Sequence, residues 1–434
     1  MKIAIVGAGW AGMAAAVAAI EAGHHATVFE ASRAVGGRAR VLNGTLPDGT
    51  DVTLDNGQHI LIGAYSDTLA LMRTVGVQPE DALLRLPLTL QFQDGSGLVL
   101  PKWPSPLDAF AGILKARGWS WGDKWSLLRT AIGWQNQGFR CAPHATVADL
   151  CASPTPAVME TLMEPLCVSA LNTPAHQASG TVFLRVLQDS LFGGTGGSNL
   201  LLPRVDLGAL FPEAAARWVQ HHGCTVHTGT RVQSLQPTAE DAAPWQVNGE
   251  AFDAVVWATS ASNAVLALSE CAQTAPETIA TPIQQWVTQA QALQFEAITT
   301  VYAFATNARL KQPMLALRSN STLAPAQFVF DRGQLGGPRG LLAWVVSASH
   351  GERDVLEAQV LQQARDQFGL EMQAVQTVVE KRATFACTPA LQRPGACIAQ
   401  GLVACGDYVD GPYPATLEGA VRSGRQAISL LSNP

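Results

Sequence analysis

The first forty residues contain the feature that most constrains how this 434-residue chain can fold. Residues 2–6 have the composition of a short buried strand, and the Ala-rich run that ends at Glu21 has that of a helix. Gly7, Gly9 and Gly12 stand at the turn between them with the spacing G-x-G-x-x-G. A strand, such a turn and a helix in this order predict a nucleotide-binding α/β fold.

Each glycine of this turn has its own task. Gly7 allows the tight turn, Gly9 lets the backbone approach a pyrophosphate, and Gly12 brings helix and strand close together. The start of the helix offers free N–H groups and the positive end of its dipole to phosphates. A second strand, 26–29, delivers Glu30, which can accept hydrogen bonds from the ribose hydroxyls of an adenosine. Glycines at such turns also serve packing alone, but strand, helix and acid together favour a dinucleotide.

The residues that follow narrow the choice of dinucleotide. Arg33, Gly36, Gly37 and Arg38 form the pattern R-x-x-G-G-R. Two glycines let the loop wrap closely around a cofactor, and the forked guanidinium of Arg38 can neutralise its pyrophosphate. NAD dehydrogenases have no use for this pattern here. It resembles the amine-oxidase and phytoene-desaturase superfamily of FAD enzymes, and that resemblance implies non-covalently bound FAD.

Composition excludes several other classes of protein. Hydrophobic residues make up 47% of the chain, charged residues only 14%, and the net charge is −6, so nothing predicts a nucleic-acid partner. The eight cysteines form no C-x-x-C pair, and no His cluster has ligand spacing, so we expect free thiols in a reducing cytoplasm and no metal site. Residues 3–20 carry no charge and imitate a signal peptide or a membrane span. Their nucleotide fingerprint predicts a buried strand and helix instead, with no targeting segment.

The motif Asp55-Asn-Gly-Gln-His59 is open to two interpretations. Superfamily members carry a similar D-x-G motif whose backbone lies beside the flavin ring. That resemblance implies that Gly57 permits the close approach and that Gln58 bonds the pyrimidine edge. Otherwise the motif is a polar turn that caps the helix starting near Tyr65. His59 is a candidate acid near the substrate, although a lone histidine is more often structural.

Near the C-terminus, a predicted buried strand ends in Gly406-Asp407, and a helix is predicted to begin near Thr416. Asp407 can bond the ribityl hydroxyls, and the N–H groups and dipole of the helix would face the flavin N1–C2=O edge, where negative charge develops on reduction. Tyr413, just before the helix, is a second candidate catalytic acid. The resemblance further implies that the backbone of Val232 contacts the adenine. The complete predicted set of FAD-binding residues is Gly7, Gly9, Trp10, Ala11, Gly12, Glu30, Ala31, Gly37, Arg38, Gly57, Gln58, Val232, Gly406, Asp407, Thr416 and Leu417.

Residues 98–135 stand apart in composition. They hold five of the eleven tryptophans and an excess of Lys and Arg over Asp, and Leu107, Phe110, Ala111 and Leu114 share one face of a predicted helix. Tryptophan and basic residues beside an apolar face are typical of helices that lie on anionic membranes. The alternative is an ordinary core helix with a solvated basic face.

Motifs along the whole chain resemble those of the hydroxysqualene dehydroxylases, also called squalene-associated FAD-dependent desaturases. They are residues 55–59, 165–174, 201–204, 329–333 and 413–419. The family implies an α/β fold: a discontinuous FAD-binding Rossmann domain of the glutathione-reductase type and a mixed α+β substrate domain. We expect the FAD domain to comprise residues 1–75, 203–265 and 375–434, and the substrate domain residues 76–202 and 266–374. Within the fourth motif we expect a turn with an Asp331–Arg332 ion pair.

Three functions follow from this resemblance. The first is reductive removal of the allylic hydroxyl of hydroxysqualene to give squalene, with an unidentified electron donor for the flavin. The second is oxidative desaturation of a polyprenoid such as phytoene, with hydride moving the opposite way. The third is a lipid or prenyl-protein carrier, which the intact G-G-R and G-D motifs disfavour. All three imply a hydrophobic polyprenoid ligand, and we expect a cytoplasmic protein at the inner face of the membrane.

Overall fold

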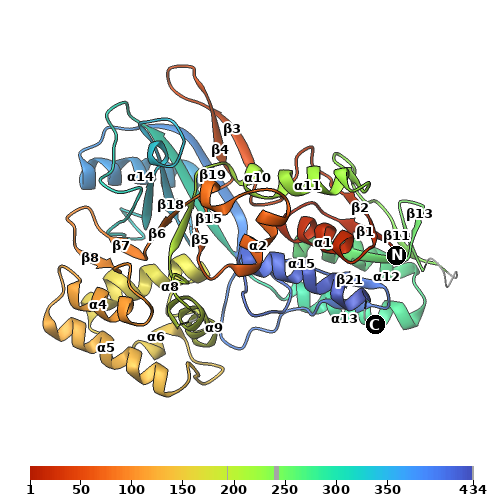
Figure 1. Cartoon of the computed structure of the whole chain (residues 1–434), viewed down its shortest axis with the longest axis horizontal. Coiled ribbons are helices and arrows are strands. Elements are labelled where there is room, and N and C mark those ends of the chain that lie inside the picture. The colour runs from red at the N-terminus through yellow and green to blue at the C-terminus, as the bar shows by residue number, and fades with distance from the viewer. Residues whose placement is uncertain (193, 239–243, 433–434) are drawn as a thin grey trace.

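The computed structural model describes residues 1–192, 194–238 and 244–432, and two β-sheets organise it (Figure 1). The first sheet has six strands in the order β10-β2-β1-β14-β21-β20, and all neighbours are parallel except β20 and β21. Its strands are β1 (Lys2–Val6), β2 (His25–Phe29), β10 (Thr225–His227), β14 (Ala254–Trp257), β20 (Cys397–Ala399) and β21 (Leu402–Ala404). Because these strands come from three distant parts of the chain, the sheet is complete only when the C-terminal segment has returned to it.

Alternating side chains of the first sheet bury both of its faces, as in other mostly parallel sheets. Ile3, Ile5 and Val256 pack in one core with the helices of the near face, whereas Val255 and Trp257 belong to the core of the opposite face. The near face carries α1 (Trp10–Glu21), α11 (Pro212–His221) and α15 (Leu417–Ser432); the other packs on α12 (Ala261–Thr274) and α13 (Glu277–Gln291) (Figure 1). This two-sided burial explains why residues 3–20 are apolar without spanning a membrane.

The second sheet is antiparallel, with the order β16-β17-β18-β15-β19. Val329 and Trp344 face one core, which contains the helix α14, whereas Phe328, Phe330 and Val345 face the other way and line a cavity. Its elements are β15 (Phe295–Phe304), β16 (Met314–Ala316), β17 (Phe328–Asp331), β18 (Leu341–Val346), β19 (Gln373–Phe385) and α14 (Arg353–Phe368).

Short strands and a group of helices complete the fold. The strands are β3 (Val41–Thr45), β4 (Asp51–Asp55), β5 (Leu61–Ile62), β6 (Leu83–Leu86), β7 (Thr89–Gln91), β8 (Gly97–Val99), β9 (Leu200–Pro203), β11 (Leu235–Pro237), β12 (Trp245–Val247) and β13 (Glu250–Phe252). The helices are α2 (Ser66–Thr74), α3 (Pro79–Ala82), α4 (Leu107–Lys115), α5 (Trp121–Asn136), α6 (Val147–Leu150), α7 (Pro156–Val158), α8 (Glu164–Leu171), α9 (Gly180–Leu187) and α10 (Leu207–Leu210). Helices α4 to α9 form a separate group below the second sheet in Figure 1. A π-helical stretch at 159–163 joins α7 to α8, and a second one at 188–192 follows α9. A 3₁₀ turn at 332–334 lies between β17 and β18.

Two of the predicted domain boundaries cut through elements of the structure. The boundary between residues 265 and 266 falls inside α12, which packs with α13 and β11. The boundary between 374 and 375 falls inside β19, which pairs with β15 along the second sheet. The hydrophobic periodicity of a strand or helix does not depend on which sheet the strand pairs in or the helix packs against. The sequence of such an element therefore does not reveal the domain to which it belongs.

All eight cysteines have free thiols, as predicted. Among the helices of the described residues, none has both the length and the apolar character needed to cross a lipid bilayer.

We predict that Gly424→Ala destabilises the protein, because α15 crosses α1 at this residue. A Cβ at position 424 would lie 2.3 Å from the carbonyl oxygen of Ala11 and 2.9 Å from the amide nitrogen of Ala15. Overpacking of this kind costs about 1–3 kcal/mol. Gly133→Ala in α5 is the matched control, since its Cβ would meet nothing within 4 Å and alanine favours helix. Denaturant unfolding compares the variants, and an unchanged midpoint for Gly424→Ala would contradict the packing argument.

Candidate cofactor and substrate cavity

A cavity of about 850 Å³ is lined by residues of both sheets. Of the site residues predicted from the sequence, all but Gly12 line it: Gly7, Gly9, Trp10, Ala11, Glu30, Ala31, Gly37, Arg38, Gly57, Gln58, His59, Val232, Gly406, Asp407, Tyr413, Thr416 and Leu417. The structure therefore brings together the start, the middle and the end of the chain, although it does not by itself assign a role to each residue.

The glycines at the first turn differ in what surrounds them. Gly7 has φ +109°, a conformation that favours glycine. A Cβ on Gly12 would lie 1.9 Å from the carbonyl oxygen of Gly7, so this glycine serves the contact between helix and strand. A Cβ on Gly9 would meet nothing closer than the Cα of Gly37, at 3.8 Å. Packing within the protein thus does not require glycine at position 9, whereas the close approach of a pyrophosphate bound in the cavity would.

Glu30 follows β2 and lines the same end of the cavity. Its carboxylate accepts hydrogen bonds from the amides of Ala8 (2.7 Å) and Ser32 (2.8 Å), which hold both oxygens in place. Each carboxylate oxygen can accept more than one hydrogen bond. The side chain is therefore oriented and still able to bind the two hydroxyls of a ribose.

Arg38 and Asp407 form an ion pair at the cavity wall. Arg38 also donates through Nη1 to the carbonyl oxygens of Ala383 (2.6 Å) and Arg382 (3.3 Å). The sequence led us to expect Arg38 at the pyrophosphate and Asp407 at the ribityl chain. The structure joins the two residues, so a pyrophosphate or ribityl group bound here would meet a pair of opposite charges.

The loop from Asp55 to His59 turns at Gly57, which has φ +97°. Nδ1 of His59 lies 3.1 Å from the carbonyl oxygen of Gly57. Burial lowers the pKa of His59, and the nearby charge of Arg38 lowers it further, against the opposing effect of the Gly57 carbonyl. The imidazole is therefore neutral at pH 7, which argues against its proposed role as an acid.

Arg332 does not line the cavity but contacts Gln58 and Asp55 of the loop at 55–59, and the sequence analysis gave it a different partner. The predicted Asp331–Arg332 ion pair is wrong: Asp331 lies 3.8 Å from Arg309, and Arg332 lies 3.7 Å from Asp55. Adjacent residues at the end of a strand point in opposite directions, which separates the two side chains. Only the motif at 329–333 drew attention to Arg332, and nothing in it indicated Asp55 as the partner.

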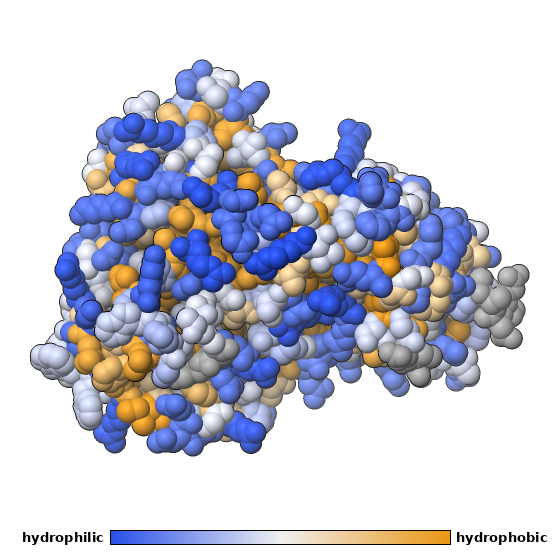
Figure 2. Space-filling view, viewed as in Figure 1, coloured by the Kyte–Doolittle hydropathy of each residue, from blue (hydrophilic) through white to orange (hydrophobic). Residues whose placement is uncertain are grey.

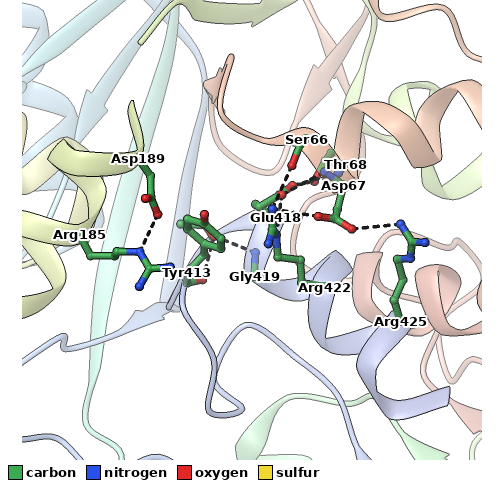
Figure 3. Close-up of polar contacts among 11 residues, drawn as sticks. Ser66, Asp67, Thr68, Arg185, Asp189, Tyr413, Glu418, Gly419, Arg422 and Arg425 are labelled. Atoms are coloured by element: carbon green, nitrogen blue, oxygen red, sulfur yellow. Dashed lines mark hydrogen bonds and ion pairs between the residues drawn. The ribbon is translucent and has the colours of Figure 1, made fainter. Parts of the chain in front are cut away.

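Tyr413 lies between the Arg185–Asp189 ion pair and the first turn of α15 (Figure 3). The guanidinium of Arg422 is 4.6 Å from the centre of its ring. Burial raises the pKa of Tyr413, as does the carboxylate of Asp189, while the charges of Arg422 and Arg185 act in the opposite direction. Asp189 also lines the cavity, but the sequence analysis missed it, because an Arg and an Asp four residues apart look like an exposed helix pair.

The first turn of α15 is held by its own residues. The hydroxyl of Thr416 accepts a hydrogen bond from the amide of Gly419 (2.9 Å). Glu418 is fully buried and accepts hydrogen bonds from the amides of Asp67 (3.1 Å) and Thr68 (2.9 Å) at the start of α2 (Figure 3). These contacts fix the N-terminus of α15 at the cavity, where its dipole favours negative charge.

Beyond the polar end, the cavity continues into an apolar chamber. Its wall comes from the helices, the short strands and the second sheet, and its apolar side chains include Leu88, Leu90, Leu166, Leu187, Leu191, Leu200, Met314, Phe328, Phe330, Val345 and Val378. A cavity wall with this lining suits a hydrocarbon chain.

Comparisons with known proteins agree with this geometry. The model of the family described as flavin containing amine oxidoreductase matches residues 10–428. Proteins named hydroxysqualene dehydroxylase are similar over almost the full length: that of Rhodopseudomonas palustris is 26% identical (98% of this chain, 97% of the relative), and that of Zymomonas mobilis is 24% identical (98% of each). A zeta-carotene desaturase of Synechocystis is 40% identical, but over 78 residues only, 18% of this chain and 15% of its own. The crystal structure of an oxidoreductase from Methanosarcina mazei has a TM-score of 0.72 at 16% identity (99% of this chain, 100% of the other), which supports the predicted fold class.

We predict that Glu30→Ala weakens the binding of FAD by about 1–3 kcal/mol, because hydrogen bonds to the ribose are lost. That loss corresponds to a roughly 5- to 150-fold higher Kd. Glu250→Ala is the control, since Glu250 is half-exposed and pairs with Lys2 on the same domain. Titration of the apoprotein with FAD gives both Kd values. Equal affinity of the Glu30→Ala variant and the wild type would place the ribose elsewhere.

Proposed function

The chain belongs to the flavin-containing amine oxidoreductase family and is an FAD-dependent oxidoreductase, and we propose that it removes the hydroxyl group of an allylic polyprenoid alcohol of the hydroxysqualene type. One observation carries the proposal: a single cavity is lined both by the residues predicted to bind FAD and by many apolar side chains, and Tyr413 and Asp189 line the same cavity. Similarity to hydroxysqualene dehydroxylases over nearly the whole chain supports it further.

The reaction exchanges a C–O bond for a C–H bond. An allylic C–O bond breaks readily because the resulting cation is delocalised, but hydroxide is a poor leaving group and needs a proton as it departs. When bound, reduced FAD supplies the hydride that completes the new C–H bond. The products are then the alkene, water and oxidised flavin, which an external two-electron donor must reduce again.

Tyr413 is the better of the two candidate acids. Its phenol carries a proton at neutral pH, and a phenol is a stronger acid than the N–H of a neutral imidazole, which is the form that the lowered pKa of His59 favours. The phenolate left after proton transfer would lie beside Arg422, 4.6 Å from its ring centre. A cation in the adjacent apolar chamber would be shielded from recapture by water.

The direction of hydride transfer distinguishes this proposal from oxidative desaturation. We expect photoreduced enzyme, kept anaerobic and given hydroxysqualene, to form squalene while its flavin is reoxidised. Oxidised enzyme given phytoene should keep its oxidised spectrum.

Tyr413→Phe should slow product formation by roughly 10²–10⁴-fold, as expected for the loss of a general acid, and His59→Gln should slow it less. Bleaching of the flavin by phytoene, with no turnover of hydroxysqualene, would overturn the proposal in favour of a desaturase. A protein that does not bind FAD and does not turn over either compound would instead favour a carrier.

We also propose that α4 and α5 attach the protein to an anionic membrane. Seven of the eleven exposed large hydrophobic side chains in the described residues lie between positions 99 and 132. They are Val99, Trp103, Leu107, Phe110, Trp121, Trp125 and Ile132. Figure 2 shows hydrophobic surface gathered at the lower left, over α4 and α5. Lys102, Lys115, Arg117 and Arg129 are exposed in the same segment, so the surface combines apolar and basic groups as an interfacial helix does.

The structure divides the tryptophans of this segment into two kinds. Trp121 and Trp125 are 74% and 68% exposed, whereas Trp119 and Trp134 are buried, and the indole N–H of Trp119 donates to the hydroxyl of Thr161 (2.9 Å). Trp119 and Trp134 therefore belong to the core, and a test of membrane attachment should leave them unchanged.

We predict that Trp121→Ser combined with Trp125→Ser weakens binding to phosphatidylglycerol-containing vesicles at least tenfold, because two interfacial anchors are lost. Leu323→Ser combined with Val355→Ser, at exposed sites outside the segment, is the control. Sedimentation with vesicles measures both, and circular dichroism verifies the fold. Undiminished binding by the tryptophan variant would show that this face does not meet the membrane.

A further inference from the structure

Arg332 is a buried cation for which the proposed function has no role. Its side chain is 6% exposed, and that of Asp55 is 2% exposed, with 3.7 Å between Nη2 and Oδ2. The other carboxylate oxygen of Asp55 accepts a hydrogen bond from the amide of Leu207 (2.8 Å). Removing both charges of a buried ion pair from water costs free energy that their attraction often fails to recover. Stability alone therefore does not explain a buried arginine at position 332.

The second contact of Arg332 reaches the loop that lines the cavity. Its Nη1 donates to Oε1 of Gln58 at 3.1 Å. A guanidinium has donors only, so the amide oxygen of Gln58 must face Arg332, and the NH₂ group must face the other way. One N–H of that group points to the carbonyl oxygen of His59, 3.2 Å from Nε2. The other remains available, and Gln58 lines the cavity.

The backbone on both sides of this contact is held firmly. The hydroxyl of Tyr302, on β15, donates to the carbonyl oxygen of Asp55 (3.0 Å). Nδ2 of Asn56 donates to the carbonyl oxygen of Arg38 (2.8 Å) and to Glu380 (3.2 Å). Contacts with β15, β19 and the Arg38 segment therefore hold the loop in place. The contact with Arg332 then determines which way the side-chain amide of Gln58 is turned.

We infer that Arg332 is a positioning residue that fixes the amide of Gln58 as a hydrogen-bond donor toward the flavin. A freely turning glutamine offers either an acceptor or a donor, whereas this one offers an N–H alone. A donor toward a flavin carbonyl or ring nitrogen stabilises the negative charge that forms on reduction. Arg332 thereby favours reduced FAD without touching it, and the inference concerns FAD binding rather than the identity of the polyprenoid.

A double-mutant cycle tests whether Arg332 acts through Gln58. The variants are Arg332→Met, Gln58→Met and the double variant, and the readouts are the midpoint potential of bound FAD and its visible spectrum. We expect both single variants to move the potential in the negative direction and the double variant to move it no further than Gln58→Met. Arg309→Gln is the matched control: Arg309 is half-exposed, pairs with the neighbouring Asp331 and does not line the cavity. Its potential should equal that of the wild type.

Additive shifts, or a Gln58→Met potential equal to that of the wild type, would overturn the inference. If Arg332→Met does not fold, Arg332→Lys replaces it in the cycle, since lysine keeps the charge beside Asp55 but not the fork. It should give a smaller negative shift that disappears in the Gln58→Met background, and a shift that persists there would also overturn the inference. The midpoint potential of bound FAD is measured without any turnover of substrate. The result of this test therefore does not depend on whether the enzyme acts on hydroxysqualene.

Discussion

The contact between α1 and α15 is the constraint on which the rest of the structure depends. At Gly424 the backbones of two helices from opposite ends of the chain come so close that even one methyl group would collide with the carbonyl of Ala11. This contact places the start of α15 at the same edge of the sheet as the turn at Gly7 and Gly9. The Arg38–Asp407 pair, between residues 369 positions apart, then closes the cavity wall. Such distant contacts carry a high entropic cost of closure, so a large apolar core must offset it.

Much of the cofactor end was predictable from local sequence because its requirements are local. Turns with positive φ favour glycine, and the separate tasks of Gly7 and Gly12 follow from the geometry of one strand and one helix. The predicted site residues also lie around one cavity, since parallel strands deliver their carboxyl ends to the same edge. The roles of the individual residues toward FAD remain predictions.

What the sequence did not reveal was partnership between distant residues. Asp331 and Arg332 have complementary charges and are adjacent, yet their partners are Arg309 and Asp55. Strand β19 has the pattern of any half-buried strand, so its pairing with β15 was not visible, and the predicted boundary at residue 375 fell inside it. Trp119 and Trp121 are two positions apart, but one is buried and the other is the most exposed large hydrophobic side chain of the described residues. Each of these facts depends on tertiary packing rather than on local propensity.

The predicted cofactor site and the apolar chamber differ in their electrostatic requirements, and the fold meets both by keeping most charged groups apart from the hydrocarbon side chains. Around the predicted cofactor site, several charged groups are paired: Arg38 with Asp407, Arg332 with Asp55, and Glu418 with Arg422. Pairing limits the net charge that a buried flavin would experience, so single hydrogen bonds gain influence over its potential. The same cavity is lined by many apolar side chains as well as by the carboxylates of Asp189, Glu270 and Glu380, and in the proposed reaction the apolar part would keep water away from a cation formed there. A cation confined in this way has hydride capture as its favourable outcome, which links the apolar lining of the chamber directly to the proposed chemistry.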